Sequence, residues 1–470
     1  MTIRRGTWYI PKVLDPYAGM AACRENKGER EMKTITAKFG GSSLASAAQF
    51  RKVGAILSAD PARRFVVASA PGKRDSGDTK VTDLLYRCYD LAAAGEDFEP
   101  VLEQIRQRFA DIARELPVDF DVDAELVPIR EHLRTAPQRD YMASRGEYLN
   151  SRLLAAWLGW PFADAASCVR FAPDGSFDGE TTQELLSKAL GGLERAVIPG
   201  FYGADETGRV ITFSRGGSDV SGSLVARAAG ADLYENWTDV SGVLFTDPRI
   251  VKDPKPIAYI TYKELRELSY MGASVLHEDA VFPVRKANIP INIRNTNRPG
   301  DPGTMIVPEL PRGVSPAPVT GVAGRKGFDA ILVEKSMMNG EVGFGAKLLD
   351  IFADRGVPFE HCPTGIDTMS VVVSDSLFAP HREAILREVE ARLKPDAVKL
   401  EEDLALIAVV GCGMVANKGI AARILGAVTA AGVNIRMIDQ GSSELNIILG
   451  IDAADYETAV RGIYAEFYGK

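Results

Sequence analysis

Short apolar runs alternate with longer segments that repeat apolar residues at helical spacing along most of the chain. The runs of strand length cover residues 34–39, 65–69, 162–165, 196–199, 210–213 and 291–294. The segments with helical spacing cover residues 44–57, 82–91, 97–135, 148–158, 262–270 and 274–287. A further helix follows the polar turn at 215–219. Because strands and helices alternate, we expect an α/β domain with a mostly parallel sheet covered on both faces.

Two of these helices have polar residues near their expected starts. Ser42 or Ser43 is a suitable N-cap for the helix at 44–57, since a serine hydroxyl accepts hydrogen bonds from the free amides of a first turn. The sequence SRGE at 144–147 is expected to precede the helix at 148–158.

The ends of the first domain are marked by changes in composition. Residues 1–32 lack apolar periodicity and are expected to form a poorly structured extension. We hypothesise that Met32 is the true start, since the first strand follows it directly. Prolines crowd the segment that we interpret as the linker after a domain at 33–312, namely Pro308, Pro311, Pro316 and Pro318.

The C-terminal third contains an internal repeat. A shift of 76 positions places Gly343 on Gly419, together with the helices and strands around them. Each copy has the order strand, glycine turn, helix, strand, strand, helix, which is typical of a small ferredoxin-like module. We therefore expect one module at 313–400 and a second at 401–470. A duplicated dimerisation domain without a ligand is the alternative interpretation.

Composition argues against several function classes. The net charge of −8 does not suit a broad nucleic-acid surface, which requires a basic excess. No apolar run reaches the roughly 18 residues of a membrane span. The five cysteines are far apart in the chain, so the cytoplasm is the expected compartment and a disulfide framework is not expected. The four histidines are isolated, which makes histidine-based acid–base catalysis a poor hypothesis.

Two glycine-rich turns gather the charged residues best suited to chemistry. RGGSD at 215–219 combines a cation, two bare backbone units, a hydroxyl and a carboxylate at a helix start, and KFGGSS at 38–43 places a lysine at a strand end. Free amides and helix N-termini attract anions, so two such turns facing one crevice suit a polyphosphate. Neither turn has the spacing of a Walker loop. The alternative is two ordinary turns, with Asp219 as a helix cap and Lys38 as a solvated lysine.

Four motifs, together with the repeat, resemble those of aspartate kinases. The motifs are KFGGSS at 38–43, SRGEYLNS at 144–151, FSRGGSDVSGSLVA at 213–226 and TDVSGVLFTDPR at 238–249. The resemblance extends from about Met32 to the C-terminus. It implies an amino-acid kinase fold at 33–312, followed by two ferredoxin-like ACT modules.

The resemblance also implies roles for individual residues. Lys38 would bridge the transferring phosphoryl group, and Asp219 would orient Lys38 and the metal–phosphate cluster. The residues that would bind aspartate are Ser42, Thr82, Glu147, Arg215, Gly216, Gly217 and Ser218. The residues that would bind ATP are Lys38, Gly40, Gly41, Ser42, Thr238, Asp239 and Arg249. Glu147 would meet the substrate ammonium and Arg215 its α-carboxylate; the alternatives are a first-turn helix acid for Glu147 and a turn residue for Arg249. ATP would act with Mg²⁺, and no set of metal ligands is expected in the protein itself.

The same resemblance places an amino-acid effector against the glycine turn and helix start of an ACT module. The candidates in the first copy are Met338, Gly343, Phe344, Glu360 and Thr364. The candidates in the second copy are Asn417, Ile420, Gln440 and Ser442. An acidic Glu360 suits an ammonium group, which favours lysine as the inhibitor over threonine, whereas Phe344 suits the core as well as a ligand contact. The ACT modules are also the expected contact of a homodimer or homotetramer.

Two positions depart from the family pattern. Leu244 stands where many relatives carry a tyrosine, and Ser274 stands where many carry a phosphate-side lysine. The candidates to replace that cation are Lys252, Lys255 and Lys263.

The resemblance implies transfer of the γ-phosphoryl group of ATP to the β-carboxylate of L-aspartate. The product, 4-phospho-L-aspartate, would feed lysine, threonine and methionine synthesis. Because the acceptor carboxylate is already ionised at pH 7, no general base is required, and positioning with charge neutralisation must supply the rate. Two alternatives stay open: an amino-acid kinase that acts on glutamate, and an amino-acid sensor with a catalytically weak kinase part.

Overall fold

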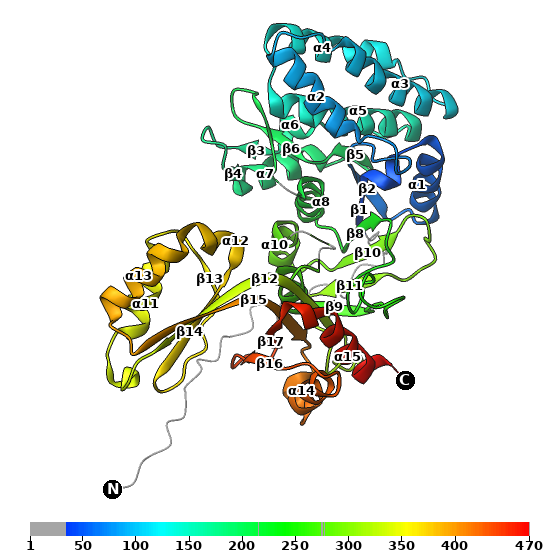
Figure 1. Cartoon of the computed structure of the whole chain (residues 1–470). Helices are drawn as coiled ribbons and strands as arrows, with labels where there is room; N and C mark the ends of the chain where they lie inside the picture. Colours follow the sequence, from blue (N-terminus) through cyan, green and yellow to red (C-terminus); the bar gives the residue numbers. More distant parts are fainter. Residues whose placement is uncertain (1–33, 215, 274–275, 277, 470) are drawn as a thin grey trace. The chain divides into compact units, whose positions relative to one another are not determined.

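A seven-stranded sheet forms the centre of the first domain (Figure 1). The structure, a computed structural model, describes residues 34–214, 216–273, 276 and 278–469. In spatial order the strands of this sheet are β5 (Ala196–Pro199), β2 (Arg63–Ala68), β1 (Ile35–Phe39), β8 (Leu233–Thr238), β10 (Ile291–Asn295), β11 (Thr304–Val307) and β9 (Tyr259–Thr261). All neighbours are parallel except β10 and β11, which confirms the mostly parallel sheet.

Both faces of this sheet are buried, because alternate residues of each strand point into different apolar clusters. In β2, Val66 packs into the cluster on one face, which includes Phe50 of α1 (Ala47–Ala59). Its neighbour Val67 packs into the cluster on the other face, which includes Leu224 of α8 (Gly217–Ala228). The short continuous apolar runs seen in the sequence are therefore strands covered on both sides.

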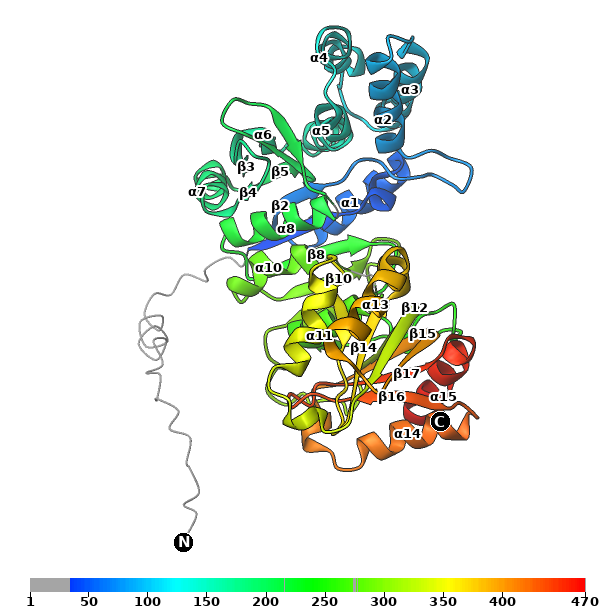
Figure 2. The same ribbon diagram turned by 60° about the vertical axis from the view of Figure 1, so that its left-hand side comes forward.

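Four helices pack together beside the β5–β2 half of the sheet (Figure 2). They are α2 (Val81–Ala93), α3 (Glu99–Glu115), α4 (Val122–Thr135) and α5 (Arg139–Leu158). Helix α5 starts well before residue 148, so the SRGE sequence lies inside the helix rather than in front of it. Glycine is required at 146 because a side chain there would come within 2.7 Å of the Cβ of Ala70.

The first helix also starts later than expected. Residues Gly41–Leu44 form a short 3₁₀ turn, η1, and α1 follows with Ser46 as its N-cap, accepting from the amide of Gln49. Neither Ser42 nor Ser43 caps α1, because both lie within the 3₁₀ turn that follows β1.

The rest of the first domain surrounds the sheet. A small sheet has the order β4 (Phe177–Asp178), β3 (Arg170–Phe171), β6 (Tyr202–Ala204) and β7 (Val210–Thr212). The remaining helices are α6 (Ala165–Cys168), α7 (Gly179–Leu190), α9 (Tyr262–Tyr270) and α10 (Glu278–Lys286). The expected strand at 162–165 is reduced to one isolated bridge, between Phe162 and Val197. In the described part of the chain, no helix is long and apolar enough to cross a membrane.

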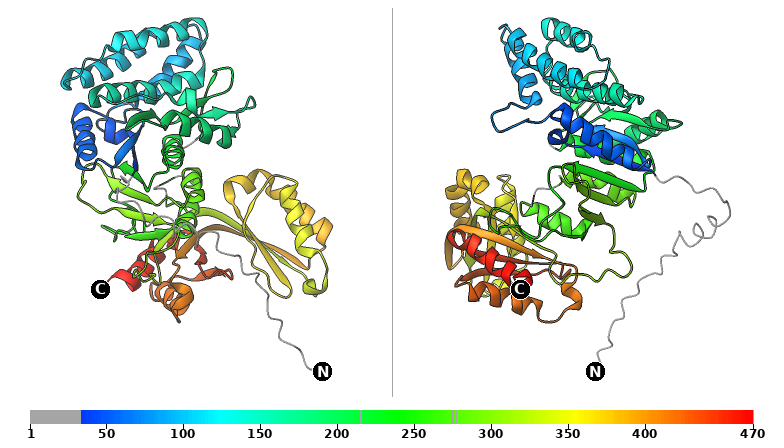
Figure 3. Two further views of the ribbon diagram at one scale, coloured as in Figure 1. Left: turned by 180° about the vertical axis from the view of Figure 1, so that it is seen from behind. Right: turned by 90° about the vertical axis from the view of Figure 1, so that its right-hand side faces the viewer.

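The repeat forms one continuous six-stranded sheet. Its order is β13 (Phe359–His361), β14 (Thr368–Ser374), β12 (Gly321–Glu334), β15 (Ala397–Val410), β17 (Asn446–Asp452) and β16 (Ile435–Asp439). The helices of the first copy are α11 (Phe344–Ala353), α12 (Asp375–Phe378) and α13 (Arg382–Leu393), and those of the second are α14 (Ile420–Ala430) and α15 (Tyr456–Tyr468). Helices α14 and α15, orange and red in Figure 3, share one apolar cluster with β15 and β17.

The two copies exchange strands, which the linear boundaries do not capture. The first half of β12, residues 321–326, pairs with the second half of β15 and so completes the sheet of the second copy. The second half of β12 pairs with β14 and with the first half of β15. The strand pairing therefore inserts the first module into the second, whereas two consecutive segments, 313–400 and 401–470, were expected. Pairing between distant strands leaves no mark in the repeat offset, which compares only equivalent positions.

Candidate active site

Lys38 and Asp219 meet where β1 ends and α8 begins. The Nζ of Lys38 lies 2.5 Å from Oδ1 of Asp219, and the side-chain amide of Asn236 donates to the same carboxylate at 2.9 Å. Lys38 is 7% exposed, so its charge is largely withdrawn from water. The structure thus brings together the two residues that sequence motifs marked as catalytic, although 181 positions separate them by their numbers, 38 and 219.

The order of the strands explains why this pair lies where a ligand can reach it. Strand β1 lies between β2 and β8 in the sheet. After β1 the strand order runs through β2 to β5 on one side, and after β8 it runs to β10 on the opposite side. The carboxyl ends of β1 and β8 therefore border a topological switch point, which is where open α/β sheets bind ligands. Lys38 and Thr238 lie at these two strand ends.

The first glycine turn is held against two neighbouring segments. The amide of Gly40 donates to the carbonyl of Trp237 at 2.9 Å, and the amide of Gly72 donates to the carbonyl of Gly41 at 2.8 Å. A side chain at Gly41 would come within 2.8 Å of the carbonyl oxygen of Ala70. Glycine is therefore required at 41 by the close approach of two backbones, and Ser42 beside it is partly exposed.

The second glycine turn begins α8. Gly216 is its N-cap residue, with a left-handed φ of 58°, and the side chain of Asp219 lies in the first turn without capping it. Gly217 is buried between two aromatic residues, since a side chain there would come within 2.6 Å of the ring of Phe201. Ser218 packs against Gly200. Arg215, expected to bind the α-carboxylate of aspartate, lies outside the described residues.

Glu147 is a fully buried carboxyl group with spare hydrogen-bonding capacity. Among the described residues, its Oε2 atom has no hydrogen-bond partner. Burial raises the pKa of Glu147 to about 8, although a backbone hydrogen bond from Ala70 and the charge of Lys38 act in the opposite direction. A buried acceptor without a partner is costly unless a ligand satisfies it. Thr82 lies in the first turn of α2, whose Val81 contacts the same α5 turn through Gly146.

The expected ATP-binding residues do not all come together. Thr238 and Asp239 are adjacent at the end of β8, and the Thr238 hydroxyl donates to Asp239 at 3.2 Å. Arg249 is instead paired with Asp247, at 2.5 Å, and its side chain is 89% exposed. Leu244 forms an isolated bridge with Pro256. The role of Arg249 stays a prediction.

The position that lacks the family lysine, Ser274, lies outside the described residues. Its three candidate replacements, Lys252, Lys255 and Lys263, are all exposed, and the ammonium of Lys255 lies 4.9 Å from the ring centre of Tyr468 in the last helix. Within the described ranges, no group of three or more Asp, Glu, His and Cys side chains is arranged to hold a metal ion.

Comparison with known proteins identifies the family. The model of the amino acid kinase family matches residues 33–295, and an ACT domain model matches residues 407–467. Aspartokinase 3 of Bacillus subtilis is 39% identical over 452 residues, which cover 93% of this chain and 99% of the relative. The crystal structure of Clostridium acetobutylicum aspartate kinase is 47% identical, with a TM-score of 0.84 over 93% of this chain and 100% of that one.

The chain belongs to the aspartate kinases. Another solved structure of this family, E. coli aspartokinase III in complex with aspartate and ADP, is 25% identical, with a TM-score of 0.70 over 93% of this chain and 100% of that one. The same E. coli enzyme in complex with lysine and aspartate is 26% identical, with a TM-score of 0.67 over 93% and 99% of the two chains. The comparisons thus agree with the family, the kinase fold and the ACT modules expected from the motifs.

In this aspartate kinase the effector candidates of the first ACT module are mostly occupied. Met338 and Phe344 are buried in the module's own apolar cluster, so Phe344 is a core residue. The Glu360 carboxylate lies 2.9 Å from Arg325 and accepts the hydroxyl of Tyr270 at 2.5 Å. Both oxygens of Glu360 therefore have partners within the chain, and its contact with an effector ammonium stays a prediction.

The candidates of the second ACT module line a common hollow. Asn417, Ile420 and Gln440 border a cavity of about 260 Å³. Lys418 and Glu444 lie on the same wall, so groups of both charges face it. Ser442 lies in the exposed turn beside this cavity, and in the first copy Gly343 and Thr364 are likewise exposed.

Two site residues had no clear sequence signal. Asn236 lies in β8, between Glu235 and Trp237, and its role depends on the register that places it beside Lys38. Trp237 reads as a core aromatic, yet its carbonyl holds the first glycine turn. A polar residue inside a buried strand is the only hint that sequence offers for such positions.

Proposed function

We propose that this protein transfers the γ-phosphoryl group of ATP to the β-carboxylate of L-aspartate, giving 4-phospho-L-aspartate and ADP. The observation that carries the proposal is the pairing of Lys38 with Asp219 at the switch point of the sheet, close to the buried carboxyl of Glu147. The E. coli relative in complex with aspartate and ADP supports both substrates.

The chemistry depends on neutralising charge rather than on moving protons. The substrate carboxylate is ionised at pH 7 and attacks directly, so the protein supplies position and positive charge. The ammonium of Lys38 stabilises the charge that develops on the transferring phosphoryl oxygens. Asp219 and Asn236 fix the position of that ammonium, because Asp219 pairs with Lys38 and Asn236 holds Asp219.

Magnesium would enter with the nucleotide. Mg²⁺ prefers carboxylate oxygens and substrate phosphates, and it keeps several of its waters. Asp219 supplies a carboxylate of this type next to the phosphate-side lysine. When bound, the ion would neutralise phosphate charge, while the protein's own residues hold the substrates.

Glu147 and Arg215 would discriminate the amino-acid substrate. A carboxylate in a dry environment with a free oxygen is suited to an α-ammonium, which would lower the pKa of Glu147 by stabilising its charged form. Thr82, Ser42 and the 216–218 backbone would complete the aspartate site.

We further propose feedback inhibition through the ACT modules, with lysine as the effector and threonine as the alternative. The lysine complex of the E. coli relative supports this choice. Helix α9 offers a route, because three of its residues form hydrogen bonds with the C-terminal modules. Glu264 accepts from the amide of Cys412 at 2.8 Å, Glu267 accepts from Asn446 at 2.6 Å, and Tyr270 bonds to Glu360.

The setting of the enzyme follows from the same proposal. It would act in the cytoplasm at the first step of lysine, threonine and methionine synthesis. A homodimer or homotetramer would form through the ACT modules. Neither a nucleic acid nor a membrane is a proposed partner.

A hydroxamate assay tests the proposed reaction. Purified protein with ATP, Mg²⁺ and hydroxylamine is expected to give hydroxamate from aspartate and not from glutamate. Product from glutamate alone would instead indicate a glutamate kinase, and no product from either would indicate a sensor. Repeating the assay with added lysine or threonine identifies the effector.

A further inference from the structure

The segment at 294–303, here called the bridge loop, contacts both sides of the proposed nucleotide site. It leaves the end of β10 and returns to β11. The hydroxyl of Thr296 lies 2.7 Å from the hydroxyl of Ser43 in the first glycine turn, and its amide donates to the carbonyl of Thr238 at 2.9 Å. Thr296 of the bridge loop therefore contacts both the first glycine turn and the end of β8.

The bridge loop also holds the segment that follows Thr238. The side-chain amide of Asn295 donates to the carbonyl of Asp239 at 3.1 Å and to the hydroxyl of Ser241 at 3.0 Å. The hydroxyl of Ser241 in turn donates to the carboxylate of Asp301 at 2.6 Å. These hydrogen bonds connect the segment at 239–241 to the bridge loop at two points, Asn295 and Asp301.

The two segments are in backbone contact as well. Gly242 has a left-handed φ of 106°, and a side chain there would come within 2.4 Å of the hydroxyl of Thr304. Gly303 has a φ of 70°, and a side chain there would come within 1.9 Å of the carbonyl oxygen of Ile293. Such spacing leaves no room for one segment to shift without the other.

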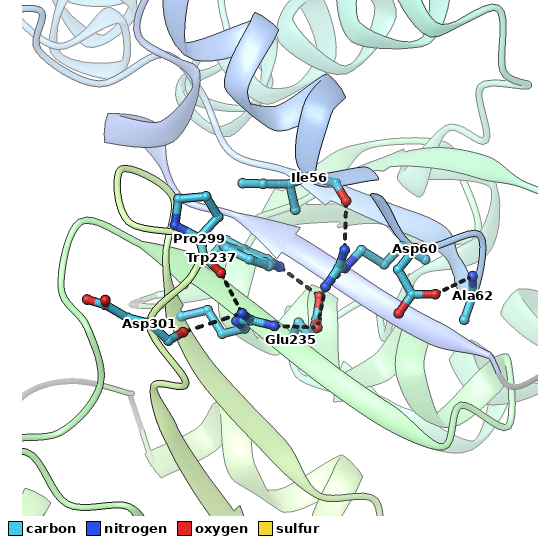
Figure 4. A network of polar contacts seen from close by, with 9 residues as sticks. Ile56, Asp60, Ala62, Glu235, Trp237, Pro299 and Asp301 are labelled. Carbon is cyan, nitrogen blue, oxygen red and sulfur yellow. Dashed lines mark hydrogen bonds and ion pairs between the residues drawn. The ribbon is translucent and has the colours of Figure 1, made fainter. Parts of the chain in front are cut away.

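A buried carboxylate anchors this assembly to the sheet (Figure 4). Glu235 is 2% exposed and receives two bonds from Arg63, at 2.7 and 3.0 Å, and one from the indole of Trp237, at 2.9 Å. Arg294 approaches the same carboxylate from the other side, at 3.6 Å. Arg63 also donates to the carbonyl of Ile56, so its own position is set by α1.

Arg294 connects that anchor to the bridge loop. Its guanidinium donates to the carbonyls of Pro299, at 2.7 Å, and Asp301, at 3.3 Å, and lies 4.7 Å from the ring centre of Trp237. The carbonyl of Trp237 accepts the amide of Gly40. The planar guanidinium of an arginine has several N–H donors and can make all these contacts at once, whereas the ammonium of a lysine cannot.

We propose that Arg294 is a positioning residue for ATP, acting through the bridge loop. Anchored on Glu235, it fixes the loop that aligns the glycine turn at 40–43 with the segment at 238–241. This inference rests on the proposed ATP site and goes beyond it, since Arg294 is not among the residues expected to bind ATP. Loss of the guanidinium should widen the gap between the two nucleotide-binding segments while leaving Glu147 and the turn at 216–218, on the aspartate side, in place.

The test compares Arg294→Lys with Arg114→Lys, a conservative change at an exposed arginine of α3. For Arg294→Lys we expect the Kd of ATP, measured by calorimetry, and the KM for ATP to rise about tenfold. The KM for aspartate should stay within about twofold, and the thermal midpoint should stay close to that of wild type. Arg114→Lys should match wild type in every measurement.

A second variant separates positioning from stability. Asp301→Ala removes only the acceptor of Ser241 at a partly exposed site and should raise the Kd of ATP in the same direction. Unchanged ATP affinity in both variants overturns the proposal, and so does an equal loss of affinity for both substrates together with a lower thermal midpoint. Failure of the wild type to bind ATP or phosphorylate aspartate would instead refute the proposed function itself.

Discussion

The hydroxyl of Tyr270, in the kinase helix α9, donates a hydrogen bond of 2.5 Å to the carboxylate of Glu360 in the first ACT module. Burial and the neighbouring carboxylate raise the pKa of Tyr270 to about 12, so the hydroxyl keeps its proton and remains a donor at pH 7. Glu360 is thereby joined to the kinase domain as well as to Arg325. The bond places a direct polar contact between the regulatory and catalytic parts of the chain.

Tyr270→Phe should weaken feedback without affecting uninhibited catalysis. It removes one charge-assisted hydrogen bond, worth on the order of 1 kcal/mol, so the lysine concentration for half inhibition should rise about fivefold. Turnover without effector should stay close to wild type, because Tyr270 does not touch the Lys38–Asp219 pair. Tyr259→Phe, at an exposed tyrosine of β9, is the control. Equal inhibition curves for all three proteins would show that this contact does not couple the domains.

Lys38→Ala should reduce turnover by several orders of magnitude. Loss of a preorganised charge at a phosphoryl-transfer site typically costs ~3 kcal/mol or more. The fold should survive, since Asp219 keeps its bond to Asn236 and some contact with water. The measurements are kcat in the hydroxamate assay and the circular dichroism spectrum, with the exposed Lys188→Ala as control. Turnover within about tenfold of wild type would remove Lys38 from the mechanism.

Glu147 should make stability fall with pH. Burial raises its pKa from 4.5 to about 8, so the folded protein binds a proton at neutral pH that the unfolded chain releases. The stabilisation from this proton is complete below pH 4.5 and is lost as the pH rises toward 8. The glutamine in Glu147→Gln cannot ionise. As the pH rises through this window, the thermal midpoint of the wild type should therefore fall relative to that of the variant. A difference between the two midpoints that does not change with pH would contradict the raised pKa.

Gly41→Ala should disturb nucleotide binding by steric means alone. The added Cβ would come within 2.8 Å of the carbonyl oxygen of Ala70 and 3.1 Å of the amide of Gly72, and neither backbone atom can move freely. We expect the KM for ATP to rise about tenfold or more. Gly426→Ala, where the new methyl meets nothing within 4 Å on α14, should instead be neutral or stabilising by roughly 0.5–1 kcal/mol. An unchanged KM for ATP in Gly41→Ala would show that the turn can accommodate a Cβ and that glycine is not required there.

Particular residues show how far the sequence could lead. The glycine turns and their charges pointed to Lys38 and Asp219, because turn chemistry is local and leaves a short motif. The start of α5 was misplaced, because SRGE was expected to precede the helix, and only the close approach of Ala70 gives a reason for a glycine inside it. The contacts of Glu360 with Arg325 and Tyr270 could not be predicted, since nothing near Glu360 in the sequence indicates either partner.

By itself the sequence determined the alternation of strands and helices, the duplicated C-terminal module and the two phosphate-type turns. Each of these features can be recognised from the spacing of residues within one continuous stretch of the chain. Only the tertiary structure decided that β12 is shared by both modules, that Asn236 supports Asp219, and that Arg294 and Glu235 sit behind the nucleotide segments. These relations depend on the register between strands far apart in the chain. Register is set by how whole faces pack, and no local pattern records it.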